Sequence, residues 1–91
     1  MTAEVAAQIR ERLAKALAPA RLEIRDDSHL HAGHAGAREG GHYHVTIAAE
    51  AFRGRLPLAR HRLVYESLGD LMTGRIHALS IDASLPENPA P

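Results

Sequence analysis

The chain has 91 residues with eleven acidic and eleven basic side chains, so we expect one small domain, and its bulk charge indicates no partner. It has no cysteine, which excludes disulfide bonds, thiol catalysis and metal sites made only of cysteine. Its apolar runs are too short to span a membrane and its first residues do not resemble a signal peptide, so a soluble cytoplasmic protein is expected. Seven histidines are unusual for this length.

The first part of the chain predicts a helix and a strand. Apolar residues recur every four positions near the N-terminus, which predicts an amphipathic helix over about residues 3–17 that Pro19 ends. Residues 21–25 alternate strictly between polar and apolar side chains and predict a half-buried strand. Its inward side chains are expected to be Leu22 and Ile24.

A histidine-rich loop and a second strand are predicted next. Residues 29–41 combine glycines, alanines and histidines, a composition that favours a loop without core residues. Residues 42–47 alternate again and predict a strand with inward Tyr43, Val45 and Ile47. His42 and His44 share its other face, and we expect them to be surface residues rather than metal ligands.

The second half predicts a turn, a long helix and a third strand. Phe52 is expected to fill the space beneath a turn over residues 49–54, and Pro57 to begin the helix. Gly74 is the expected left-handed cap. The third strand is predicted over residues 76–81. The apolar side of the helix is expected to face the core through Leu58, His61, Val64, Tyr65, Leu68, Leu71 and Met72.

This order of elements predicts an α+β fold with two layers, a three-stranded mixed sheet and helices on one face. The first two strands are expected to be antiparallel, and the second and third, joined by a helix, parallel. Parallel strands begin at the same end of a sheet, so His77 is expected at the edge where loop 29–41 arrives. We expect a single domain over residues 1–85 and a flexible, proline-rich tail over residues 86–91.

Four arginines precede or begin the predicted long helix with no acidic residue between them: Arg53, Arg55, Arg60 and Arg62. Positive charge is unfavourable at a helix N-terminus, so these side chains are candidates for binding phosphates of nucleic acid. Alternatively they face a partner protein or water. Aromatic residues are few, which does not favour single-strand recognition. No catalytic set or phosphate-loop motif is recognisable, so an enzyme is not expected.

Several segments of the chain resemble the BolA family over about residues 5–86. The most specific are Arg60-His61-Arg62-Leu63-Val64-Tyr65 and Ile76-His77-Ala78-Leu79; further matches are Leu22-Glu23-Ile24, Asp26-Asp27-Ser28, His42-Tyr43-His44-Val45 and Phe52-Arg53-Gly54. The resemblance implies an α-β-β-α-β domain similar to the type II K-homology fold. That agrees with the topology predicted from periodicity.

The resemblance also implies a heterodimer with a monothiol glutaredoxin around a bridging [2Fe-2S] cluster, in iron–sulfur trafficking or iron-status signalling. The glutaredoxin cysteine and glutathione would hold one iron. The ligands of the other would be His77 and a loop histidine, best matched by His31. The loop is longer than is usual in the family, so His34 or His29 could replace His31. Because the chain has no cysteine, the thiolates of such a cluster must come from the partner. The alternative is a DNA-binding transcriptional regulator of the BolA type that uses the arginines around Arg60 and Arg62.

Overall fold

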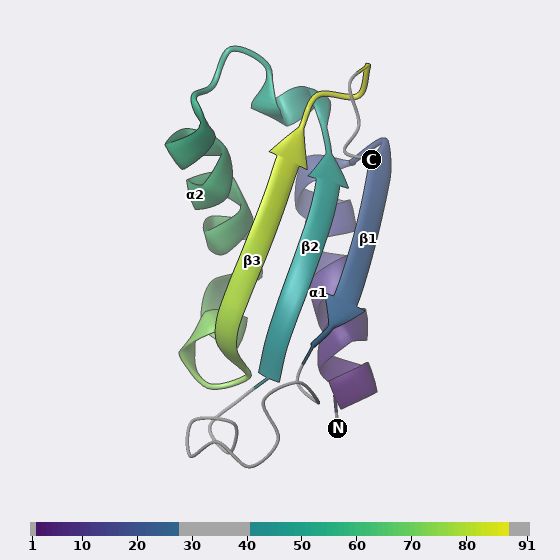
Figure 1. Ribbon diagram of the computed structural model, residues 1–91, viewed down its shortest axis with the longest axis vertical. Helices are drawn as coiled ribbons and strands as arrows, with labels where there is room; N and C mark the ends of the chain where they lie inside the picture. The colour runs from purple at the N-terminus through teal and green to yellow at the C-terminus, as the bar shows by residue number, and fades with distance from the viewer. Residues whose placement is uncertain (1, 28–40, 88–91) are drawn as a thin grey trace.

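The computed structural model describes residues 2–27 and 41–87, and its elements follow the predicted order (Figure 1). The helices and strands are α1 (Thr2–Leu17), β1 (Arg21–Asp26), β2 (Gly41–Ala48), α2 (Pro57–Leu68) and β3 (Ile76–Ser84). Two short 3-10 helices flank α2, namely η3 (Glu50–Phe52) and η4 (Gly69–Thr73).

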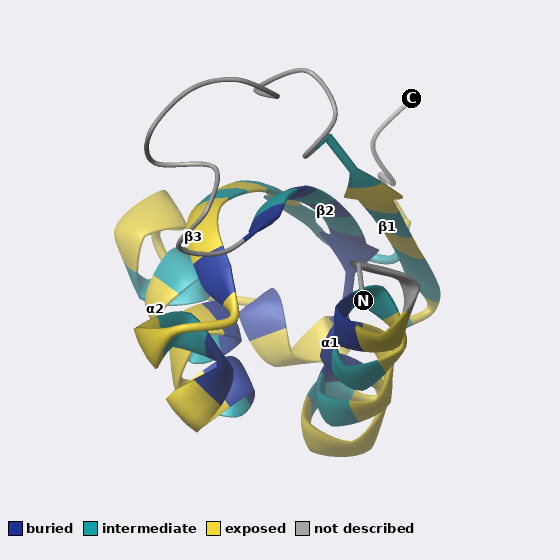
Figure 2. Ribbon diagram, turned by 90° about the horizontal axis from the view of Figure 1, so that it is seen from below, coloured by how far each residue is buried: buried dark blue, intermediate teal, exposed yellow. Residues whose placement is uncertain are grey.

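The three strands form one mixed sheet in the order β1-β2-β3. Strand β2 pairs antiparallel with β1 and parallel with β3. Both α1 and α2 lie on the same side of the sheet (Figure 2), so no helix of the described residues covers its other face, here called the open face. The predicted two-layer α+β fold is confirmed, and β2 occupies the centre because it carries the most regular alternation of buried and half-buried residues.

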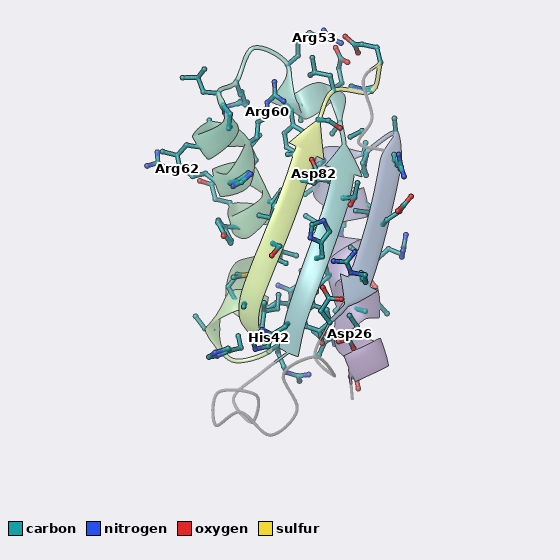
Figure 3. All side chains as sticks on the ribbon, viewed as in Figure 1. Asp26, His42, Arg53, Arg60, Arg62 and Asp82 are labelled. Carbon is teal, nitrogen blue, oxygen red and sulfur yellow. The ribbon has the colours of Figure 1, made fainter. Side chains whose placement is uncertain are left out.

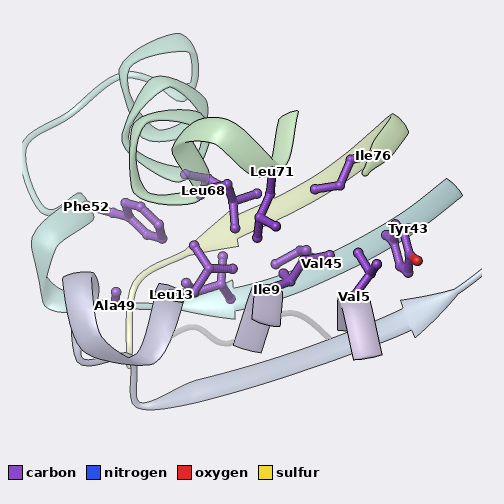
Figure 4. Close-up of a cluster of buried hydrophobic side chains, with 12 residues drawn as sticks. Val5, Ile9, Leu13, Tyr43, Val45, Ala49, Phe52, Leu68, Leu71 and Ile76 are labelled. Atoms are coloured by element: carbon purple, nitrogen blue, oxygen red, sulfur yellow. The ribbon is translucent and has the colours of Figure 1, made fainter. Parts of the chain in front are cut away.

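The core lies between the two helices and the sheet (Figure 4). One apolar side chain per turn of α1 and alternate side chains of β2 are buried: Val5, Ile9 and Leu13 from α1, and Tyr43, Val45 and Ile47 from β2. As predicted, Phe52 is fully buried beneath the turn made by η3, and Pro57 begins α2. Burying a side chain of this size contributes about 1.5–3 kcal/mol.

The prediction of one long helix that ends at Gly74 is wrong. Helix α2 ends at Leu68, because Gly69 adopts a positive φ of 54° and donates its N–H to the Tyr65 carbonyl. Gly74 has an extended φ of 166°. Leu71 still reaches the core, but it does so from η4.

The predicted apolar face of α2 is also wrong in part. Val64 and Leu68 are buried, whereas Leu58 and Tyr65 are 65% and 40% exposed. At about 100° per residue, Leu58 lies roughly 120° and Tyr65 roughly 100° around the helix from Val64. The core therefore covers a narrower arc of α2 than the apolar pattern suggests.

The strands are longer than predicted. β1 includes Asp26, which pairs with Tyr43, and β3 continues to Ser84 because it pairs with β2 as far as Ala48. Beyond β3, Leu85 packs against the core. The flexible tail over residues 86–91 stays a prediction, since residues 88–91 lie outside the described part of the chain. In that described part, no helix is both long and apolar enough to cross a membrane.

Candidate functional site

A β-bulge at the start of β3 determines where the third-strand histidine points. Gly41 pairs with Ile76, but the next residue of β2, His42, pairs with Ala78. His77 is thus an extra residue opposite its partner strand. Such a bulge interrupts the alternation of a strand and re-aims a side chain, and bulges are frequent next to functional sites.

The bulge allows two apolar side chains of β3 to reach the core despite their odd spacing. Ile76 and Leu79 are three residues apart, so they would face opposite sides of a regular strand. In the structure Ile76 is buried and Leu79 packs against the core. His77 and Ala78, which lie between them, are both exposed. The bulge therefore turns His77 away from the core.

His77 lies beside a second histidine, His42 of β2. The two ring centroids are 5.0 Å apart and the ring planes are tilted by 45°. His42 points to the open face of the sheet, because its neighbour Tyr43 is buried on the helix side. Two imidazoles on one tetrahedral metal, with metal–nitrogen distances of about 2 Å, have ring centres about 5 Å apart. The pair thus has the spacing of a two-imidazole metal site.

Both ends of the histidine-rich loop arrive at this edge of the sheet. The Asp27 N–H donates to the His42 carbonyl at 2.7 Å, and the Gly41 N–H donates to the Arg75 carbonyl at 3.2 Å. Figure 3 shows Asp26 and His42 at the same end of the sheet. The prediction that His77 lies where the loop arrives is confirmed for these ends. The proposed loop ligands themselves lie outside the described residues: His29, His31 and His34.

The histidine pair cannot complete a metal site alone. Among residues 2–27 and 41–87, no group of three or more His, Asp or Glu side chains could hold a metal ion. Two imidazoles leave two positions of a four-coordinate metal to other donors. The described residues do not supply these donors, so they would have to come from outside residues 2–27 and 41–87 or from another molecule.

The sequence did not predict that His42 lies beside His77. The pairing depends on the strand register, which periodicity does not give. One signal was present, because Ile76 and Leu79 are separated by two non-core residues at the start of a strand. That spacing contradicts a period of two and indicates a bulge.

At the other end of the sheet, Arg53 is held by two carboxylates. It forms ion pairs with Glu50 and with Glu87, the latter at 2.7 Å. The hydrogen bonds from Arg53 are the main cause of the lowered pKa of both Glu50 and Glu87. Arg53 therefore joins η3 to the segment after β3, and its charge is compensated.

The other three predicted arginines are not in ion pairs within the described part of the chain. Arg55 donates through Nε to the Ala51 carbonyl at 3.1 Å, and Arg60 donates through Nε to the Arg55 carbonyl at 2.9 Å. These bonds close the turn before α2 and give two arginines at this helix start a structural function. Arg62 is exposed and makes no hydrogen bond to another described residue. Figure 3 shows Arg53 and Arg60 toward the end of the molecule opposite His42, and Arg62 on the flank of α2.

The fold and the histidine edge define a class, namely small α+β domains with two helices on one face of a three-stranded mixed sheet and a histidine at the bulged start of the last strand. Solved structures that share this fold resemble the chain closely. The BolA domain of SufE1 from Arabidopsis thaliana superposes with a TM-score of 0.80 at 44% identity, covering 90% of this chain and 92% of that one. BolA1 from Arabidopsis thaliana gives a TM-score of 0.80 at 42% identity, covering 92% and 95%.

The family model for BolA-like protein matches residues 13–88, and the chain belongs to this family. Among its relatives, BolA-like protein 1 of Mus musculus is 44% identical over 89 residues, which are 93% of this chain and 64% of that protein. SufE-like protein 1, chloroplastic/mitochondrial, of Arabidopsis thaliana is 42% identical over 85 residues, 87% of this chain and 23% of that protein. The chain thus spans less than two thirds of these relatives. Because that plant relative is named for organelles, it does not support the expected cytoplasmic location.

Proposed function

We propose that this chain is a non-enzymatic adaptor that pairs with a monothiol glutaredoxin and supplies histidine ligands to a bridging [2Fe-2S] cluster. It would act in iron–sulfur trafficking or iron-status signalling in the cytoplasm. The observation that carries the proposal is the bulge that exposes His77 beside His42, 5.0 Å away between ring centroids. A buried His77 would not be available to a partner's metal group.

The proposed division of ligands is the one that the resemblance to the BolA family implies, and the donors of this chain are compatible with it. Imidazoles can replace two thiolates on one iron of a [2Fe-2S] centre and thereby raise its reduction potential. His77 is the ligand on the described part of the chain, and His31, or else His34, is the proposed second ligand from the loop. The glutaredoxin cysteine and glutathione would hold the other iron. His42, next to His77, is positioned to support this site or to bind in place of a loop histidine.

The open face of the sheet supports the proposal of a shared group. Both helices cover the opposite side (Figure 2), so no other described element shields the histidine edge from a second protein. His77 is exposed, and His42 and His44 are half-buried on their strand. Only the neutral ring of a histidine binds a metal, so cluster transfer to this edge is expected to weaken at acidic pH.

A titration with visible circular dichroism tests the proposal. A monothiol glutaredoxin that carries its glutathione-ligated [2Fe-2S] cluster is mixed with the wild-type chain and with His77→Ala, His31→Ala and His44→Ala. We expect a new cluster spectrum that saturates at one-to-one, is lost with His77→Ala and is altered with His31→Ala. His44→Ala is the matched control, because His44 lies opposite Ser80 rather than beside His77. An unchanged spectrum with the wild-type chain would refute the shared cluster.

DNA binding at Arg53, Arg55, Arg60 and Arg62 is the competing proposal. It is supported by the exposed guanidinium of Arg62, which forms no ion pair with a residue of the described ranges, but the ion pairs of Arg53 count against it. Binding through phosphates weakens steeply with salt. This second function gains support if duplex DNA binds the chain with a steep salt dependence and if Arg62→Ala abolishes that binding. Binding that changes neither with salt nor with Arg62→Ala contradicts it.

A further inference from the structure

An uncovered apolar strip runs along the outer side of α2. The exposed large apolar side chains of the described chain all belong to α2 or to the residue before it: Leu56, Leu58 and Tyr65. Leu56 is 78% exposed. Leu58 and Tyr65 are seven residues apart, or about two helical turns, so they lie one above the other on the surface.

A free positive charge lies within this strip. Arg62 follows Leu58 by four residues and precedes Tyr65 by three, which places it between them on the same side of the helix. It is exposed and forms no ion pair or hydrogen bond with another described residue. We call Leu58, Arg62 and Tyr65 the outer strip of α2; Leu56, which is also exposed, directly precedes the helix.

Two further guanidinium groups belong to the same end of the helix. Arg55 and Arg60 each donate one hydrogen bond, through Nε, to a backbone carbonyl of the turn. The terminal nitrogens of both groups are not in ion pairs within the described residues. Because Nε is fixed, these guanidinium groups are already oriented and lose less freedom on binding a carboxylate. Glu66, the acidic residue of α2, lies one turn after Arg62, and the three arginines Arg55, Arg60 and Arg62 outnumber this one carboxylate.

We propose that the outer strip of α2 binds a short acidic segment of another protein, one that presents two or three apolar side chains to Leu56, Leu58 and Tyr65 and carboxylates to Arg55 and Arg62. Exposed apolar side chains rimmed by charge are typical of protein interaction sites, and arginine and tyrosine are enriched at the centres of such interfaces. This inference does not depend on the glutaredoxin proposal, because it concerns a different surface.

The composition of the outer strip distinguishes this partner from two others. A nucleic-acid backbone would use the arginines but would leave two exposed leucines without partners, and the strip offers one aromatic ring for stacking. A second copy of the chain would present the same three arginines with a single carboxylate of α2, that of Glu66, so most of the positive charge would stay uncompensated. An acidic segment with apolar side chains would contact the leucines through its apolar residues and pair its carboxylates with the guanidinium groups.

The outer strip is remote from the histidine edge. Figure 3 shows Arg62 on the outer flank of α2 and His42 at the far end of the sheet. A segment bound along the strip would leave His42 and His77 accessible. The domain would then hold two proteins at once, one at each surface, as an adaptor requires.

The test uses the full chain and a synthetic probe. The probe is an 18-residue peptide that carries leucines at helical spacing on one face and glutamates elsewhere. A scrambled peptide of the same composition and a 20-nucleotide single-stranded DNA are the competitors. Binding is followed by ¹H–¹⁵N NMR spectra, and the variants are Leu58→Ser, Arg62→Glu and, as matched control, Lys15→Glu on the exposed side of α1. Because these residues are exposed, each variant is expected to fold, which far-ultraviolet circular dichroism checks.

We expect shift changes confined to residues 55–66, with affinity reduced at least tenfold in Leu58→Ser and in Arg62→Glu. Lys15→Glu should bind the peptide as the wild-type chain does. Equal binding of the scrambled peptide, shift changes elsewhere, or no change at millimolar peptide would overturn the proposal. The proposal would also be overturned if the DNA binds the same residues and if that binding is weakened by Arg62→Glu but unchanged by Leu58→Ser. That pattern identifies a nucleic-acid surface.

Discussion

Replacing Gly41 by alanine should disturb both the core and the histidine edge, although it adds only one carbon atom. A Cβ at Gly41 would lie 2.4 Å from Cε2 and 2.6 Å from Oη of Tyr43. Optimal contacts between such atoms are about 3.5–4.0 Å. Tyr43 is buried, so its ring has to move within a packed core or leave it.

The expected loss of stability can be estimated from this contact. Overpacking a core by one methyl group costs about 1–3 kcal/mol. An unfolding entropy of about 2.1 cal/mol/K per residue gives roughly 0.19 kcal/mol/K for this chain, so the melting temperature should fall by about 5–16 °C. Because Gly41 pairs with Ile76 directly before the bulge, the shift should also move His42 relative to His77.

Thermal unfolding followed by circular dichroism measures the first effect, and the glutaredoxin titration measures the second. The matched control is Gly74→Ala, because a Cβ there meets nothing within 4 Å and the backbone is extended. We expect the control to melt within about 3 °C of the wild-type chain, an effect typical of surface substitutions. If Gly41→Ala melts as the control does, Tyr43 is not packed against Gly41 and the structural reasoning is refuted.

Three further predictions concern the core and the ion pairs. Phe52→Ala removes the fully buried ring and should cost about 3–5 kcal/mol, a large share of the total stability of such a domain, whereas Phe52→Leu should remain folded; urea denaturation compares them. Arg12→Ala removes a 2.7 Å hydrogen bond to the Leu68 carbonyl at the end of α2 and should cost about 1 kcal/mol, while Asp70→Asn, which keeps that bond, should cost less. Arg53 lowers the pKa of Glu50 and Glu87, so their stabilising effect is complete above the ordinary glutamate pKa and is lost as pH falls through the lowered values. The difference in stability between the wild-type chain and Arg53→Gln should therefore be constant from pH 7 to about pH 5 and shrink below about pH 4; a difference that grows on acidification contradicts the assignment.

Local periodicity predicted the elements whose burial is regular. α1 and β2 present one apolar side chain per turn or per pleat to the same core, and each of their buried residues lies within a uniform pattern. The element order then limited the topology, because two strands joined by a helix favour a parallel pair. The fold could therefore be predicted without any knowledge of contacts.

The end of α2 could not be predicted in the same way. Gly69 and Gly74 are both suitable helix caps, and Leu71 and Met72 continue the apolar period between them. Which glycine takes a positive φ depends on where the helix meets α1, and Arg12 fixes that position by binding the Leu68 carbonyl and Asp70. The contact between α1 and the end of α2 thus determines that the helix ends at Gly69 rather than at Gly74.

The strand topology predicted the position of the candidate site in the sheet, but it did not predict the contacts within the site. The shared edge of β2 and β3 follows from their parallel pairing, which brought His77 to the loop. Which residue lies beside His77 depends on the register of β2 and β3. A bulge of one residue shifts that register and so changes the neighbour. The functions of the arginines depend on turn geometry in the same way: Arg55 and Arg60 bind carbonyls within the turn before α2, a relation that charge counting cannot reveal.

The crossover between the parallel strands explains how one small domain can present two separate surfaces. α2 runs back along the sheet (Figure 1). The turn before it, which holds Arg53 and Arg55, therefore lies at one end of the sheet, and η4 leads into β3 and His77 at the other end. Its twelve residues span about 18 Å. The helix is fixed at its start by the Arg60–Arg55 hydrogen bond and at its end by Arg12. A helix fixed at both ends has little freedom to transmit movement, so a segment bound to the outer strip should leave the His42–His77 distance unchanged. The two surfaces are therefore expected to bind additively, with neither ligand altering the affinity for the other.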